Sequence, residues 1–137
     1  MATKTPVPHP FAPDYGAMFN WGVKLTDFSE IFLMAGLGAV GSDGTVHHPE
    51  DAVAQTKDIL DGIPGYLETA GYTKQDIIRI EFTMTKLVPP ESYEAIFGLF
   101  AEFFADVDVK PAAGTLRVIE ALAIPGMLVE YEFWCAK

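Results

Sequence analysis

Short apolar stretches bounded by turn residues recur along the chain, and each has the length of a buried or half-buried strand. Strands are predicted on this basis over residues 18–25, 30–38, 76–87, 114–119 and 127–135. The stretch over 30–38 is nearly all apolar, which favours a more buried position. Alternation over 76–87 predicts an apolar side, made of Ile78, Ile80, Phe82 and Met84, and a polar side, made of Arg79, Glu81, Thr83 and Thr85.

Two stretches between these strands carry apolar residues at helical spacing. The first is predicted as a helix over about 50–70, ended by Gly71. Gly62 and Pro64 lie inside it. Because an interior proline costs about 3 kcal/mol, we expect the helix to bend or break near Gly62. The second helix is predicted over 91–105, and its aromatic stripe is typical of a side that faces the core.

The order of these elements, β-β-α-β-α-β-β, predicts an α+β fold, a two-layer sandwich in which two helices cover one face of a mixed sheet. Helical crossovers favour parallel pairing of the strands that they join. Residues 15–137 are expected to form one domain, preceded by an extended N-terminal arm over 1–14, where four prolines disfavour a helix. Two interpretations of the arm stay open: a loose terminus, which we favour, and an arm packed over a neighbouring subunit.

Charge and cysteine content narrow the classes of partner. The 137-residue chain has a net charge of −10 and only two arginines, Arg79 and Arg117. Nucleic acid and anionic membrane surfaces are therefore disfavoured as partners, because both require clustered cations. The one cysteine, Cys135, leaves no intrachain disulfide, and the first residues lack a signal-peptide pattern, so we expect a cytoplasmic protein.

Two further groups of residues have the types found in reactive sites. His47 and His48, followed by Glu50 and Asp51, have the residue types of a metal site. Adjacent histidines on a turn point apart, however, and the acids suit a helix start, so no metal site is predicted. Cys135 has no histidine or second cysteine beside it in sequence and is expected to be a buried or unreactive thiol.

The last third of the chain carries a distinctive block of sequence. Residues 111–118 are Pro-Ala-Ala-Gly-Thr-Leu-Arg-Val, and residues 122–132 are Leu-Ala-Ile-Pro-Gly-Met-Leu-Val-Glu-Tyr-Glu. The block closely resembles that of the RidA/YjgF (L-PSP) family, in which Pro-Ala-Arg-Ser-Thr-Val leads to Leu-Pro-x-Gly-Ala-Leu-Val-Glu-Ile-Glu. The pairs Gln55-Thr56 and Ala70-Gly71 add to the resemblance.

This resemblance implies a RidA/chorismate-mutase-like fold that assembles as a homotrimer, with clefts between subunits that bind small ligands. The family's best-known activity is the hydrolysis of imines and enamines from amino acids, which releases ammonia and uses no metal or organic cofactor. A partner subunit would also account for the mixed polar and apolar residues expected on the helix-free face of the sheet.

The resemblance also places a set of cleft residues on this chain. The family's substrate-binding arginine falls on Ala113, and the serine after it falls on Gly114. The remaining cleft positions, from the first strand onward, fall on Phe19, on Ala35 with Gly36, on Phe97 and on Glu130. Only the glutamate keeps a reactive group, so the cleft is expected to be more apolar than that of the family.

Glu130 is the expected catalytic residue. Beside Phe19, Trp21 and Phe97 its protonated form would be favoured, so that it acts as an acid or positions water as a base; a structural carboxylate is an equal alternative. Arg117, on the same strand face as position 113 but roughly 13 Å along, and Thr115 are candidates to orient a substrate. A structural ion pair of Arg117 with Glu130 or Glu132 is the favoured alternative.

Two functions follow from these expectations. The first is a cofactor-free enzyme that hydrolyses or deaminates a small organic metabolite, of the imine or enamine type or related to it. The second is a non-catalytic trimer that binds a small ligand. A third, RNA cleavage, conflicts with the net charge of −10.

Overall fold

The computed structural model describes residues 2–137, in which six strands and two α-helices form a strand-rich domain. The strands are β1 (Thr3–Val7), β2 (Gly22–Thr26), β3 (Ile31–Leu33), β4 (Ile77–Thr85), β5 (Ala112–Ile119) and β6 (Val129–Ala136). The helices are α1 (Ala52–Thr69) and α2 (Tyr93–Phe103). Within the described residues, no helix is long and apolar enough to cross a membrane.

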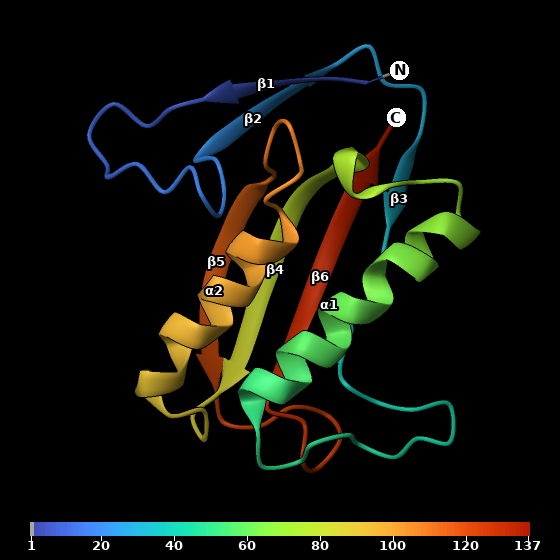
Figure 1. Cartoon of the computed structure of the whole chain (residues 1–137), viewed down its shortest axis with the longest axis vertical. Coiled ribbons are helices and arrows are strands. Elements are labelled where there is room, and N and C mark those ends of the chain that lie inside the picture. Colours follow the sequence, from blue (N-terminus) through green and yellow to red (C-terminus); the bar gives the residue numbers. More distant parts are fainter. Residues whose placement is uncertain (1) are drawn as a thin grey trace.

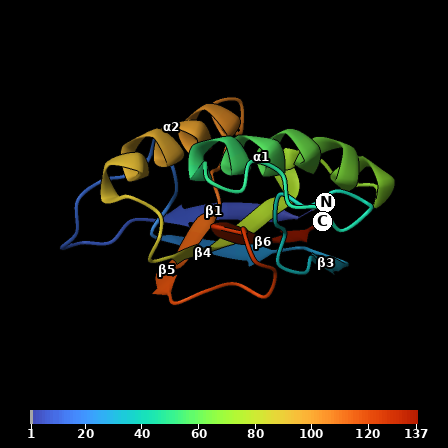
Figure 2. The ribbon, with the colours of Figure 1, turned by 90° about the horizontal axis from the view of Figure 1, so that it is seen from below.

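The main sheet has four strands in the order β3-β6-β4-β5 (Figure 1). Strands β4 and β5, which α2 connects, are parallel, whereas β6 is antiparallel to both β3 and β4. Both helices lie on one side of this sheet (Figure 2). The predicted α+β sandwich with a mixed sheet is therefore confirmed, and the face turned away from the helices is called the open face below. It carries Arg79, Glu81 and Thr83 of β4, Arg117 of β5, and Glu130, Glu132 and Trp134 of β6.

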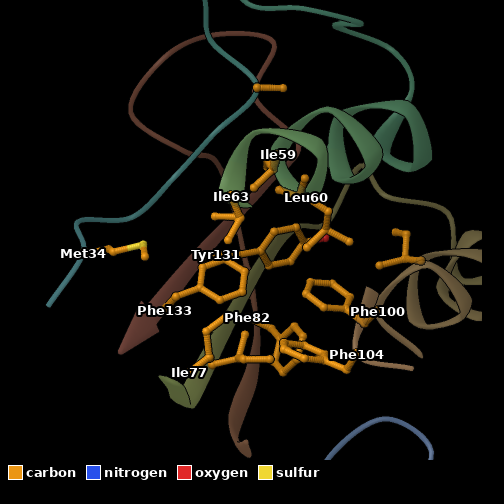
Figure 3. Packing of buried hydrophobic residues seen from close by; sticks show 14 of the residues in the cluster. Met34, Ile59, Leu60, Ile63, Ile77, Phe82, Phe100, Phe104, Tyr131 and Phe133 are labelled. Carbon is orange, nitrogen blue, oxygen red and sulfur yellow. The ribbon is translucent and has the colours of Figure 1, made fainter. Parts of the chain in front are cut away.

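The core lies between the helices and the sheet. Figure 3 shows Tyr131 of β6 at its centre, with Leu60 of α1 and Phe100 of α2 beside it. The rings of Tyr131 and Phe100 lie 4.9 Å apart, edge to face. The Tyr131 hydroxyl and the Thr56 hydroxyl of α1 form a buried hydrogen bond of 2.7 Å. This bond and the apolar packing together fix α1 on the strands.

Helix α1 continues without a break through Gly62 and Pro64, so the predicted break is wrong. Gly62 and Pro64 lie on its exposed side, while Ile63 and Leu67 are almost wholly buried. Burying a large apolar side chain contributes about 1.5–3 kcal/mol, so several such residues outweigh the cost of one proline. Gly71, with a φ of 80°, ends the helix as predicted.

The alternation of apolar and polar residues predicted for 76–87 is wrong at the start of the strand. The pairing of β4 with β6 shifts register between Ile77 and Arg79, so the core holds Ile77 and leaves Ile78 out. An extra residue in one strand reverses the side that every earlier residue faces. Beyond this bulge the prediction is correct, with Ile80, Phe82 and Met84 in the core.

The N-terminal region differs from the loose terminus that the sequence favoured. Residues Thr3–Val7 form β1, which pairs with β2 in a separate two-stranded antiparallel sheet. Lys4 Nζ joins this sheet to the domain by donating to the carbonyls of Ile77 (3.3 Å) and Val109 (2.7 Å). The stretch predicted as a buried strand over 30–38 forms only the short β3, and its Ile31 and Leu33 are exposed.

Candidate functional site

An apolar cavity of about 230 Å³ lies between α2, the helix-facing side of β5 and the segment that precedes β2. Five of its ten lining residues carry aromatic rings: Phe19, Trp21, Phe82, Phe97 and Phe100. The other five are Met18, Ile80, Ala113, Gly114 and Leu116. None of the ten has a charged side chain, so this cavity offers a ligand apolar contact and no ion pair.

Pairing with the edge of the main sheet brings the segment before β2 to this cavity. The Asn20 amide donates to the Pro111 carbonyl (2.9 Å), and the Asn20 side chain donates to the Lys110 carbonyl (2.7 Å). The neighbouring rings of Phe19 and Trp21 then meet edge to face at 5.6 Å, and Trp21 Nε1 donates to the Pro13 carbonyl (2.7 Å). These contacts set one wall of the cavity against Phe97 of α2.

A second bulge decides which side of β5 each residue faces. Ala113 pairs with Ile80 and Leu116 pairs with Phe82, so residues 114 and 115 are both opposite Glu81. Ala113 therefore faces the helices, whereas Arg117 lies on the open face. The prediction that positions 113 and 117 share one strand face is wrong for this reason, and Arg117 cannot act in the cavity beside Ala113.

Arg117 pairs with Glu81 and not with Glu130 or Glu132, so this part of the prediction is also wrong. Its Nη1 lies 3.0 Å from Glu81 Oε2, while Arg79 Nε and Nη2 lie 2.9 and 2.6 Å from Oε1. The Glu81 side chain is only 9% exposed. Burial raises its pKa, but the bonds and charges of both arginines outweigh burial and hold the pKa below its ordinary value.

Gly114 makes room for this Arg79–Glu81–Arg117 cluster. A Cβ atom on residue 114 would overlap the Glu81 carboxylate. The residue therefore lines the apolar cavity and also leaves space for the cluster on the open face. The resemblance singled out position 114 as one where glycine replaces the family's serine, but the buried Glu81 behind it was not foreseen.

Glu130 lies apart from the cavity. Its half-buried side chain is on the open face against Gly36, where a Cβ atom would overlap Glu130 Oε1. Glu130 pairs with Thr83, and Thr83 pairs with Arg117, so the acid and the arginine stand two strands, roughly 10 Å, apart. The expected neighbours Phe19, Trp21 and Phe97 are in the cavity instead.

The predicted site residues thus form two groups within one chain. Phe19, Trp21, Phe97, Ala113 and Gly114 line the cavity. Glu130, Gly36 and Arg117 lie on or beside the open face, while Ala35 and Thr115 are exposed. Sequence reasoning missed five cavity residues: Met18, Ile80, Phe82, Phe100 and Leu116. Of these, the alternation of β4 had marked Ile80 and Phe82 only as core, and the stripe of α2 had marked Phe100 in the same way.

The other residues that the sequence singled out, His47, Asp51 and Cys135, make structural contacts or are unreactive. His47 Nδ1 lies 3.0 Å from Asp58 Oδ2 on the surface, and Asp51 accepts from the Ala54 amide to cap α1. Across residues 2–137, no three His, Cys, Asp or Glu side chains are grouped so that they could hold a metal ion. Burial and the nearby Asp76 carboxylate raise the pKa of the Cys135 thiol to about 12, which leaves it protonated at neutral pH.

A model of the Endoribonuclease L-PSP family matches residues 12–136. The chain belongs to this family. Among solved structures, the Rid-family protein YyfB from Yersinia pestis is similar at a TM-score of 0.85 and 22% identity, with 98% of both chains covered. A YjgF/YER057c/UK114-family protein from Mycobacterium tuberculosis has a TM-score of 0.62 and 23% identity, with 100% of both chains covered. At these identities the structures support the fold.

The L-PSP family match confirms the resemblance first found in the closing block. Two residues of that block make close contacts in the structure: Gly114 lies against the Glu81 carboxylate, and Glu130 lies against Gly36. The Gln-Thr pair is structural: Gln55 bonds to the carbonyls of His48 and Gly126 and to the Leu128 amide, and so ties α1 to the loop before β6.

Proposed function

We propose that this L-PSP family member is a homotrimeric, cofactor-free enzyme that hydrolyses or deaminates a small organic metabolite in a cleft between subunits. The supporting observation is the division of the expected cleft residues into two groups on one chain. The apolar cavity would supply one wall of the cleft, and Glu130 with Gly36 of a neighbouring copy would supply the other. Exposed apolar side chains on β3 and β6, Ile31, Leu33 and Trp134, support a second copy over this part of the open face.

The chemistry assigned to Glu130 needs no group beyond water. In the hydrolysis of an imine, water adds to the C=N carbon, and the nitrogen takes up a proton. Loss of ammonia then leaves a carbonyl compound. A carboxyl group suits both proton transfers, because it accepts a proton from the attacking water and returns one to the departing nitrogen. The apolar cavity would hold the organic part of the substrate.

Glu130→Gln tests this assignment, because it removes the proton-transferring group and keeps the size of the side chain. Glu132→Gln is the matched control, since Glu132 lies on the same strand and the same face, two residues along. Ammonia release from imines generated in situ by an amino-acid oxidase is the first assay, followed by enol-ether and ester substrates. Loss of turnover by about 10²-fold or more in Glu130→Gln alone supports the enzyme. Equal activity of the two variants would contradict it.

A non-catalytic ligand-binding trimer is the second candidate. It is favoured by one observation, that all ten residues lining the cavity lack a charged or reactive side chain. A binding protein would show saturable binding with no turnover in any of these assays. Glu130→Gln would then change affinity only modestly.

Cleavage of RNA, the activity in the family's name, fits this chain poorly. The net charge is −10, and both arginines are bound to the single carboxylate of Glu81. Affinity for RNA comes largely from cations that neutralise phosphates. A nuclease assay with single-stranded RNA is expected to show no cleavage.

A further inference from the structure

We propose that the apolar cavity accepts an uncharged aromatic ring, and that Trp21 sets the upper size of that ligand. This inference rests on the proposed function in one respect, that this cavity is the ligand-binding wall of the cleft. It goes further by naming the chemical class of ligand and one residue that determines specificity.

The charge of the ligand follows from the lining. A carboxylate entering the cavity would lose its hydration and find no cation among the ten lining side chains. The two arginines lie on the other face of the sheet and are bound to Glu81. Position 113, which faces the cavity, is alanine. An anionic ligand is therefore disfavoured, whereas a neutral ligand loses little hydration free energy when it enters the cavity.

The shape of the ligand follows from the rings and from the volume. Aromatic side chains favour edge-to-face and offset contacts with another ring. Phe82 already meets Phe97 and Phe100 edge to face, at 6.2 and 5.0 Å. An apolar cavity of about 150 Å³ is known to bind benzene, so about 230 Å³ is enough for one substituted ring.

Trp21 stands between this cavity and a second one of about 370 Å³ beneath the N-terminal segment. The two cavities share Phe19 and Trp21 as lining residues. Trp21 is 41% exposed, and its indole Nε1 donates to the Pro13 carbonyl, which holds the ring in place. Removing the indole would join the two spaces, so a larger ring system would then fit.

The charge is tested with acetophenone and benzoate, which are nearly equal in size and differ in charge. Calorimetry on the full-length protein is expected to give acetophenone an affinity higher by about tenfold or more, and Ala113→Arg to reverse the order. Equal or tighter binding of benzoate by the unaltered protein overturns the inference, as does the absence of acetophenone binding at millimolar concentration. Ring binding without turnover of any substrate would refute the enzyme and leave the ligand class standing.

The size limit is tested with 2-acetylnaphthalene beside acetophenone. Trp21→Ala is expected to improve the relative affinity for the two-ring ligand by about tenfold or more. Tyr66→Ala is the control, because Tyr66 is a ring of similar exposure, at 44%, and lies on α1, outside the lining of the cavity. Trp21→Phe, which keeps a ring on β2's side of the cavity, is expected to give a smaller change in the same direction. An unchanged ratio in both Trp21 variants overturns the role of Trp21.

Discussion

The contact between Gly114 and Glu81 allows a sharp prediction about stability. In Gly114→Ala, the new Cβ atom would overlap the Glu81 carboxylate, which is buried and bound to Arg79 and Arg117. The carboxylate cannot yield without lengthening its bonds to the arginines. Overpacking of this kind costs about 1–3 kcal/mol. Alanine is otherwise favoured over glycine within a strand by about 0.5–1 kcal/mol, so the net loss is about 1–2 kcal/mol.

The same substitution should behave differently once Glu81 is shortened. In a Glu81→Ala background the overlap is gone, and Gly114→Ala should be neutral or stabilising by about 0.5 kcal/mol. The coupling free energy between the two sites is therefore about 2 kcal/mol. Urea unfolding of the four proteins measures it, at one fixed protein concentration because assembly would shift the midpoints. An equal loss from Gly114→Ala in both backgrounds would refute the argument.

Three further predictions concern groups described above. Thr56→Val leaves the buried Tyr131 hydroxyl without its partner and should lower the free energy of unfolding by about 1–3 kcal/mol; a loss below about 0.5 kcal/mol would contradict the role of this bond. Iodoacetamide should leave Cys135 unmodified at pH 8 in the folded protein and alkylate it after unfolding in urea, as mass spectrometry would show. Because folding lowers the pKa of Glu81, the contribution of Glu81 to stability is present above its ordinary pKa of about 4.5 and is lost as the pH falls further. Between pH 5 and pH 3, Glu81→Gln should therefore lose less free energy of unfolding than the unaltered protein. Equal losses in the two proteins would refute this.

Much of the fold could be predicted from the local pattern of apolar and polar residues. The crossover of β4 and β5 through α2 needed only the order of elements and the preference for parallel pairing. The two bulges did not follow, because a bulge depends on the partner strand and leaves no mark in the alternation of one strand. This is why Ile78 was assigned to the core and why Arg117 was assigned to the face of Ala113.

The candidate site was predicted residue by residue but not in its arrangement. The resemblance supplied Phe19, Phe97, Ala113 and Glu130 as members of one cleft. The structure holds the first three in one cavity and Glu130 on the open face. Sequence reasoning had no means to separate them. The distance between two strands across a sheet is set by the order in which the strands pair, and the spacing of residues along the chain does not give that order.

The attachment of β1 and β2 has a consequence for how a ligand enters. These strands form their own sheet and join the rest through few polar contacts, chiefly those of Lys4 and Asn20. Such a unit opens at a lower free energy than the central strands, so its amide protons should exchange with solvent sooner than those of β4 and β6. Phe19 and Trp21 belong to the chain that links β1 to β2, so each local opening also removes one wall of the cavity. Ligand entry and the amide exchange of β1 and β2 would then report the same fluctuation, and a bound ligand should suppress it.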